Sequence, residues 1–158
     1  MSIYMKVEGI DGTVTAQGHE KWIECGSFQF GVGRAISNTI GGTSDREASR
    51  PSISEISVTK EMDKSSPMLF NEATVGKAKK VEIHMCKTGT SAIETYQEYI
   101  LEDCMVSGYS VSSGGDRPSE SLSLSFAKIT TKYIPFNEKG EAGSPVPAGY
   151  DLNKGTKI

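Results

Sequence analysis

The stretch SSGGDRPSESLSLSFAKITTKY, residues 112–133, joins a turn to a strictly alternating strand. Its apolar residues share one parity and its serines share the other: Leu122, Leu124 and Phe126 against Ser121, Ser123 and Ser125. Successive side chains of a strand point to opposite faces, so the pattern predicts one apolar face and one serine face. The outer face of a half-buried strand usually carries charges, and a face of bare serines therefore indicates a surface that meets something other than bulk water.

Further strand-like runs surround this stretch. They lie at residues 3–7, 22–30, 53–62, 79–87 and 96–114. The last run reads as two halves with a bend or bulge near Asp103. In the opening stretch the apolar parity switches between Phe126 and Ile129, which either a bulge or burial of both faces would produce. About seven or eight strands and one helix predict a mainly β fold, a closed or sandwiched antiparallel barrel.

The helix is predicted within DKSSPMLFNEATVGK, residues 63–77. Ser66 suits the cap, Pro67 suits the first helical position because it has no N–H to lose there, and Gly76 suits the far end. About ten residues separate these signals. The apolar residues of this segment are expected to face a sheet: Met68, Leu69, Phe70 and Val75.

The chain length of 158 residues fits a single domain over residues 1–158. Residues 31–52 are expected to form a long polar loop, a class of segment that is usually functional or disordered. Residues 136–158 form a Gly/Pro-rich tail, in which Tyr150 and Leu152 either anchor a late edge strand or stay mobile.

Charge and hydropathy limit the possible partners. The net charge is −3, and no basic run exceeds the pair Lys79 and Lys80. Nucleic acids and anionic membranes require a concentrated basic patch, so we expect neither nucleic-acid binding nor membrane insertion. The opening residues MSIYMKVEGIDG lack the basic and apolar segments of a signal peptide. We therefore expect the protein to begin in the cytoplasm, with any export carried out by a dedicated machine.

Catalytic and metal-binding patterns are missing from the sequence. Cys25, Cys86 and Cys104 are an odd number of cysteines without C-x-x-C spacing, which favours buried, reduced thiols over a zinc site or a disulfide framework. His84 could serve Cys86 or Cys104 as a base, but no local signature supplies the orienting third group. We predict no metal, no cofactor and no catalytic residue.

Three segments together resemble the haemolysin-coregulated protein family, the tube protein of bacterial type VI secretion systems. They are DKSSPMLFNEATVGKAKKVEIHMCK, SVSSGGDRPSESLSLSFAKITTKY and AGYDLNKG. The likeness runs from Ile3 to about Asn153, and its most specific part is the Asp63–Pro67 helix start followed later by Gly-Gly and Leu-Ser-Leu-Ser-Phe.

The resemblance implies a mainly β fold, in which two antiparallel sheets form a β-barrel or sandwich with one α-helix packed at the side. It also implies a structural protein rather than an enzyme. It implies homohexameric rings that stack into a tube, which a contractile sheath propels from the cell beneath a spike of valine-glycine-repeat proteins. It also implies that small effector proteins ride in the ring lumen, and that the secretion machine exports the protein without a signal peptide. The serine face of Ser121, Ser123 and Ser125 is then expected at a subunit contact or on the lumen wall.

The long loop resembles the segment that reaches from one ring to the next in this family. The candidate stacking residues are Gly41, Gly42, Thr43, Ser44, Asp45, Arg46 and Glu47. They include both charge signs, so stacking through them should weaken with salt.

Two other hypotheses stand beside the tube protein. One is a monomeric β-sandwich that binds a ligand such as a carbohydrate, although Trp22 sits on an apolar strand face typical of a core residue. The other is an enzyme that uses Cys86 or Cys104 with His84. Unusual thiol reactivity would favour the enzyme, and a monomeric solution mass would favour the binding module.

Overall fold

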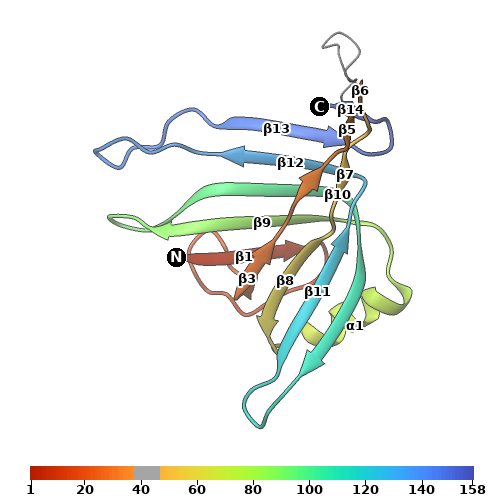
Figure 1. The fold of residues 1–158 in the computed structure, drawn as a ribbon. Coiled ribbons are helices and arrows are strands. Elements are labelled where there is room, and N and C mark those ends of the chain that lie inside the picture. The colour runs from red at the N-terminus through yellow and green to blue at the C-terminus, as the bar shows by residue number, and fades with distance from the viewer. Residues whose placement is uncertain (38–46) are drawn as a thin grey trace.

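The structure, a computed structural model, describes residues 1–37 and 47–158. Its main strands form two antiparallel sheets that face each other, with one helix at the side (Figure 1). The first sheet contains, in spatial order, β14 (Thr156–Lys157), β13 (Val146–Asp151), β12 (Lys128–Tyr133), β10 (Ile93–Ser112), β9 (Lys79–Thr88), β1 (Ser2–Val7) and β2 (Ile23–Cys25). The second contains β10 again, then β11 (Ser119–Ser125), β8 (Ile56–Glu61) and β3 (Ser27–Gln29).

The long strand β10 belongs to both sheets. Its first part pairs with β9 and β12, and its second part, from Met105 onward, pairs with β11. Between them Asp103 has a positive φ of 51°, and the register with β9 shifts between Leu101 and Cys104. Asp is one of the few residues other than Gly that tolerates this conformation. The predicted bend near Asp103 is confirmed, and it turns β10 from one sheet into the other (Figure 1).

The core lies between the two sheets. Its fully buried side chains come from both sheets and from the helix: Met5, Ile23, Ile56, Val58, Leu69, Ile83, Leu101, Leu122 and Leu124. The apolar parity predicted for Leu122 and Leu124 is confirmed. Among the described strands no ladder joins β2 to β8 or β3, so the architecture is a sandwich rather than a closed barrel.

Three predicted segments differ in detail. The run 22–30 is two short strands, because the chain passes at Gly26 from β2 in one sheet to β3 in the other. The polar loop begins and ends as a ribbon, in which β4 (Val32–Gly33) pairs with β7 (Ser52–Ile53) and β5 (Ile36–Ser37) pairs with β6 (Glu47–Ala48). The parity switch after Phe126 marks a change of strand and sheet, not a bulge, since β11 ends at Ser125 and β12 starts at Lys128.

The tail forms the predicted late strand. β13 pairs with β12 along Val146–Asp151, and β14 pairs with β13. Tyr150 is half-buried against the main core, so the aromatic anchor predicted for this segment is in place, whereas Leu152 is exposed.

The helix α1 spans Ser66–Val75, as long as predicted, and ends at Gly76. Its cap is Ser65 rather than Ser66, and no cap side chain bonds to the helix backbone. Of the predicted apolar stripe only Leu69 is buried in the core. The other three members remain exposed, at 45% for Met68, 55% for Phe70 and 80% for Val75.

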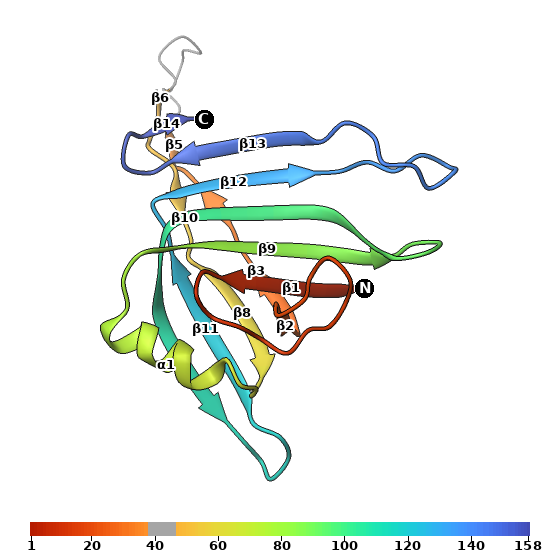
Figure 2. The same ribbon diagram turned by 180° about the vertical axis from the view of Figure 1, so that it is seen from behind.

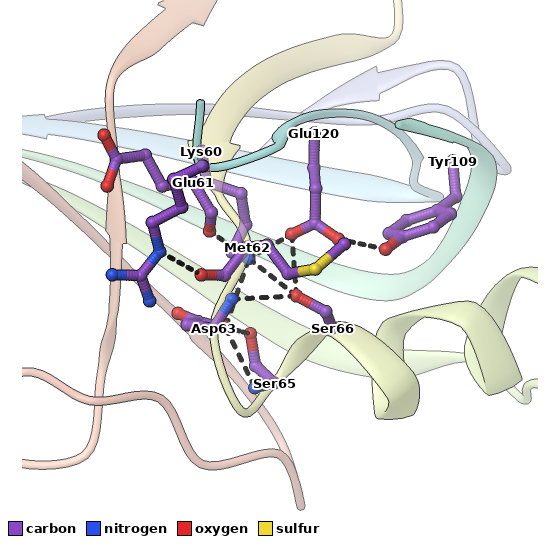
Figure 3. Close-up of polar contacts among 9 residues, drawn as sticks. Lys60, Glu61, Met62, Asp63, Ser65, Ser66, Tyr109 and Glu120 are labelled. Carbon is purple, nitrogen blue, oxygen red and sulfur yellow. Dashed lines mark hydrogen bonds and ion pairs between the residues drawn. The ribbon is translucent and has the colours of Figure 1, made fainter. Parts of the chain in front are cut away.

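A buried ion pair ties the start of α1 to the second sheet (Figure 3). Lys60 on β8 and Glu120 on β11 are direct partners in the strand register and point toward the core, where both side chains have no solvent exposure. Ser66 Oγ donates to Glu120 Oε1 at 2.8 Å, and the Tyr109 hydroxyl donates to Glu120 Oε2. Burial raises the pKa of Tyr109 to about 12, and the bond to Glu120 adds to this shift.

Asp63 completes this network at the helix start. Its Oδ1 accepts from the Ser65 N–H at 2.9 Å and lies 3.2 Å from Lys60 Nζ, while its own N–H donates to Ser66 Oγ at 3.0 Å. The Asp63–Pro67 motif therefore has a structural reason, because its side chains fix the turn that leads into α1 and join it to the buried ion pair. Lys60 and Glu120 were not singled out in the sequence, although both share the parity of the buried residues on their strands.

We predict that Lys60→Met lowers the free energy of unfolding by about 3–5 kcal/mol, because it leaves the Glu120 carboxylate buried without its cation. Urea unfolding followed by circular dichroism measures this change. The double variant Lys60→Met/Glu120→Leu should recover a large part of the loss, since it removes both charges together.

The matched control is Lys80→Met on β9. Lys80 pairs with Glu82 at 3.1 Å, but its side chain is 53% exposed, so the change should cost less than about 1 kcal/mol. Equal losses for Lys60→Met and Lys80→Met would contradict the importance of the buried pair.

Candidate assembly surface

The serines of β11 belong to a wider uncharged surface on the second sheet. The register places Ser121 beside Thr59 and Ser110, and Ser123 beside Ser57 and Gly108. Residues directly opposite each other in an antiparallel pair project from the same side of the sheet. We call this surface the hydroxyl face: Ser27, Gln29, Ser57, Thr59, Gly108, Ser110, Ser121 and Ser123.

The hydroxyl face is accessible and carries no charge. Ser121 is exposed and Ser123 is half-buried by its neighbours. Ser27 and Thr59 bond to each other through their hydroxyls at 2.6 Å. The face can therefore be wetted, yet it presents neither a strong electrostatic field nor an apolar patch to an approaching protein.

Charged and apolar residues mark the borders of this face. Glu61 lies opposite Ser119 at one end. At the other end Ser125 lies opposite Met105, which is 47% exposed, so the structure places Ser125 at the border rather than in the middle. The alternation of β11 predicts its own serines, but the contributions of β3 and β10 depend on strand order, which alternation does not reveal.

The candidate stacking residues lie mostly beyond the described residues. Gly41, Gly42, Thr43, Ser44, Asp45 and Arg46 fall outside them, and Glu47 is placed at the start of β6, opposite Ser37. The ribbon that carries Glu47 projects at the end of the sandwich where β14 lies (Figures 1 and 2). Its base borders an apolar groove of about 220 Å³, whose lining includes Val32 and Ile53 of the ribbon and Tyr150 of β13.

The geometry does not support the cysteine-enzyme hypothesis. Cys25, Cys86 and Cys104 are all free and buried. Burial raises the pKa of Cys86, and it raises the pKa of Cys25 and of Cys104 to about 12, so the thiols stay protonated near neutral pH. The nearest imidazole to Cys86 is that of His19, with Nε2 at 3.8 Å from Sγ. Within residues 1–37 and 47–158, no three His, Cys, Asp or Glu side chains are grouped so that they could hold a metal ion.

No helix in the described part of the chain is both long and apolar enough to cross a membrane. Trp22 is buried, so it offers no aromatic platform for a carbohydrate. The hydroxyl face and the ribbon are therefore the surfaces on which a function can be built.

Comparison with known proteins agrees with this picture. The sequence profile of the family described as "Type VI secretion system effector, Hcp" matches residues 4–133. Protein hcp1 of Pseudomonas aeruginosa is 30% identical over 106 residues, which cover 65% of this chain and 65% of that protein. The match thus spans slightly less than two thirds of that relative.

Solved structures extend the likeness to the whole fold. One described as the structure of a type six secretion system protein has a TM-score of 0.90 at 30% identity and covers 99% of both chains. Hcp1 of Salmonella typhimurium has a TM-score of 0.79 at 25% identity and covers 99% of this chain and 98% of its own. The chain therefore belongs to the Hcp family of type VI secretion system proteins.

Proposed function

We propose that the protein forms six-membered rings that stack into the inner tube of a type VI secretion system and carry small effector proteins in the lumen. The hydroxyl face is the observation that supports this proposal most directly. An uncharged, wettable surface across four strands suits the wall of a channel through which a folded cargo must travel.

The chemistry of the hydroxyl face favours the lumen over a subunit contact. The centre of a protein interface is usually rich in aromatic residues, Met and Arg and poor in Ser. The hydroxyl face has the opposite composition and no large apolar anchor. Small hydroxyl side chains also lose little rotamer entropy when a cargo covers them.

This assignment gives α1 a position in the ring. Leu69 of α1 belongs to the core, on the side of β11 opposite the hydroxyl face. A ring with the hydroxyl face inward therefore has α1 away from the lumen. The exposed Met68, Phe70 and Val75 then lie where a neighbouring subunit or the contractile sheath would cover them.

Stacking through the ribbon completes the proposed tube. Asp45, Arg46 and Glu47 supply charges of both signs at the candidate stacking segment, and contacts between exposed charges weaken as salt rises. The spike of valine-glycine-repeat proteins would then sit on the last ring of the stack. Release beneath this spike would bring the protein from the cytoplasm to the outside of the cell.

We predict a solution mass of about six times the chain mass of 17.0 kDa, and larger species at low salt. Light scattering on a sizing column, at several protein concentrations and two salt levels, measures both. A mass of 17.0 kDa under every condition would instead favour the monomeric ligand-binding sandwich.

Charging the hydroxyl face tests its role. The triple variant Ser121→Glu/Ser123→Glu/Ser125→Glu should keep its fold and ring mass but carry less effector, because each subunit adds carboxylates to the wall. The readout is the amount of tube protein and of effectors in the medium of a type VI-competent bacterium, measured by mass spectrometry.

The matched control replaces the same three serines by threonine, which keeps the hydroxyls and adds no charge. If the glutamate variant loses the ring and the threonine variant keeps it, the hydroxyl face is a subunit contact and not the lumen wall. Unchanged mass together with unchanged effector release would show that this face is ordinary surface.

A further inference from the structure

A second buried cluster lies outside the main core, on the outer face of β1 and β9. It contains Tyr4, Trp22 and Cys86, with Val14, Ala16 and Ile93 packed against it. The segment 13–22 between β1 and β2, which we call the cover loop, lies over these residues (Figure 2). Backbone bonds from Val14 N to Trp22 O at 3.1 Å and from Lys21 N to Val14 O at 2.8 Å hold the loop in shape.

The shortest side-chain hydrogen bond between the cover loop and β9 joins two histidines. His19 Nε2 lies 3.0 Å from His84 Nδ1, and His19 is only 5% exposed. The ring of Trp22 packs on both, with centroids at 4.7 Å from His19 and 4.5 Å from His84. Thr95 Oγ1 and Cys86 Sγ lie 3.4 Å and 3.8 Å from the same His19 nitrogen.

The surroundings select one pair of tautomers. His84 Nε2 lies 3.8 Å from Glu82 Oε2 and 3.8 Å from Glu98 Oε1, which favours a proton on that nitrogen. Nδ1 of His84 must then accept the hydrogen bond from His19 Nε2–H. This leaves His19 Nδ1 as a bare lone pair, and that atom is buried with no hydrogen-bond partner among the described residues.

A further proton fits nowhere in this closed arrangement. On His84 Nδ1 it would set two N–H donors against each other across 3.0 Å. On His19 Nδ1 it would bury a charged donor without an acceptor, which is costly. Exchange of the His19 tautomer does not help, because it moves a neutral N–H to the same unpartnered position.

Charged groups around the pair partly offset the effect of burial. Glu82 on β9 and Glu98 on β10 stabilise a protonated His84, while Lys132 on β12, 3.9 Å from Glu98, weakens that stabilisation. Glu20 lies next to His19 in the cover loop, and Tyr4 of β1 and the Cys86 thiol also face its ring.

We propose that the His19–His84 pair is a pH-sensitive latch, which holds the cover loop on the sheet near neutral pH and releases it on acidification. Release exposes Trp22 and Cys86 together with the apolar surface of β1 and β9. The protein thus has a surface whose character depends on the acidity of its surroundings.

The pKa shifts give the sign of this dependence. Burial lowers the pKa of His19 and of His84, against a smaller opposing effect of Glu98 on both. In the released loop both return toward the unperturbed value of about 6.5. The released state therefore binds protons more tightly, so the closed state is fully stabilised above about pH 6.5 and loses stability as the pH falls below it.

Thiol labelling at pH 7.5 and pH 5.5 tests the latch in the full-length protein. The reagent 4,4′-dithiodipyridine reacts across this range, and peptide mass spectrometry identifies the labelled cysteine. We expect the rate at Cys86, corrected for the rate of free cysteine, to rise several-fold at pH 5.5, with an upper limit of about tenfold for each histidine, because this pH lies about one unit below the released pKa of about 6.5. Cys25 and Cys104 in the main core are internal controls and should stay unlabelled.

His19→Gln is the matched variant, because a glutamine amide can rotate to offer His84 Nδ1 either a donor or an acceptor. Its Cys86 should be protected equally at both pH values, and the emission of Trp22, the single tryptophan, should no longer shift on acidification. Circular dichroism checks that the fold is intact. His84→Gln offers the same amide from β9 and serves if His19→Gln is poorly folded.

The chain has two histidines, so the double variant His19→Gln/His84→Gln removes every histidine titration. An acid-induced rise in Cys86 labelling that survives in this variant would assign the effect to carboxylates and overturn the proposal. Equal labelling of Cys86 in the natural protein at both pH values would overturn it as well.

Discussion

The positive φ of Asp103 is the backbone constraint on which the arrangement of the two sheets depends. Next to this residue the ladder between β10 and β9 ends, at Cys104, and the ladder between β10 and β11 begins at Met105. One covalent strand thus carries both sheets, and the angle at the bend decides how they face each other. The core between Leu101 on one part of β10 and Leu122 on the neighbouring strand exists because of that angle.

The alternation of side chains along β8 and β11 then separates polar and buried residues onto the two faces of the second sheet. Odd positions give the uncharged outer surface, which ends at Glu61, whereas even positions give the core and, at its border, Lys60 and Glu120. A buried ion pair adds little net stability over apolar residues of the same volume, but it is costly to break. Its hydrogen bonds are directional, so through Ser66 it also defines where α1 starts relative to the sheet.

Local sequence patterns predicted much of this structure. Alternation placed Leu122 and Leu124 inward, Gly76 ended the helix, and the bend at Asp103 could be expected from the two halves of its strand. Local sequence patterns did not predict the features that depend on which strands become neighbours in the sheet. The hydroxyl face needs Ser110 and Thr59 beside Ser121, and Ser27 beside Thr59, and no local signal brings residues so far apart in the chain together. The exposed apolar residues of α1 were misjudged because a stripe in the sequence does not say which side of the helix is covered.

The position of α1 has a further consequence for how copies of the chain can associate. From Met105 onward β10 is paired with β11 on one side, while its ladder with β9 has already ended on the other. A strand edge of this kind is a template for uncontrolled strand addition between molecules. The helix packs against this part of β10, with the ring of Phe70 on that of Tyr109 at 6.4 Å. It thereby obstructs backbone pairing between copies and favours association through side-chain surfaces, whose geometry limits how many copies join and in what orientation.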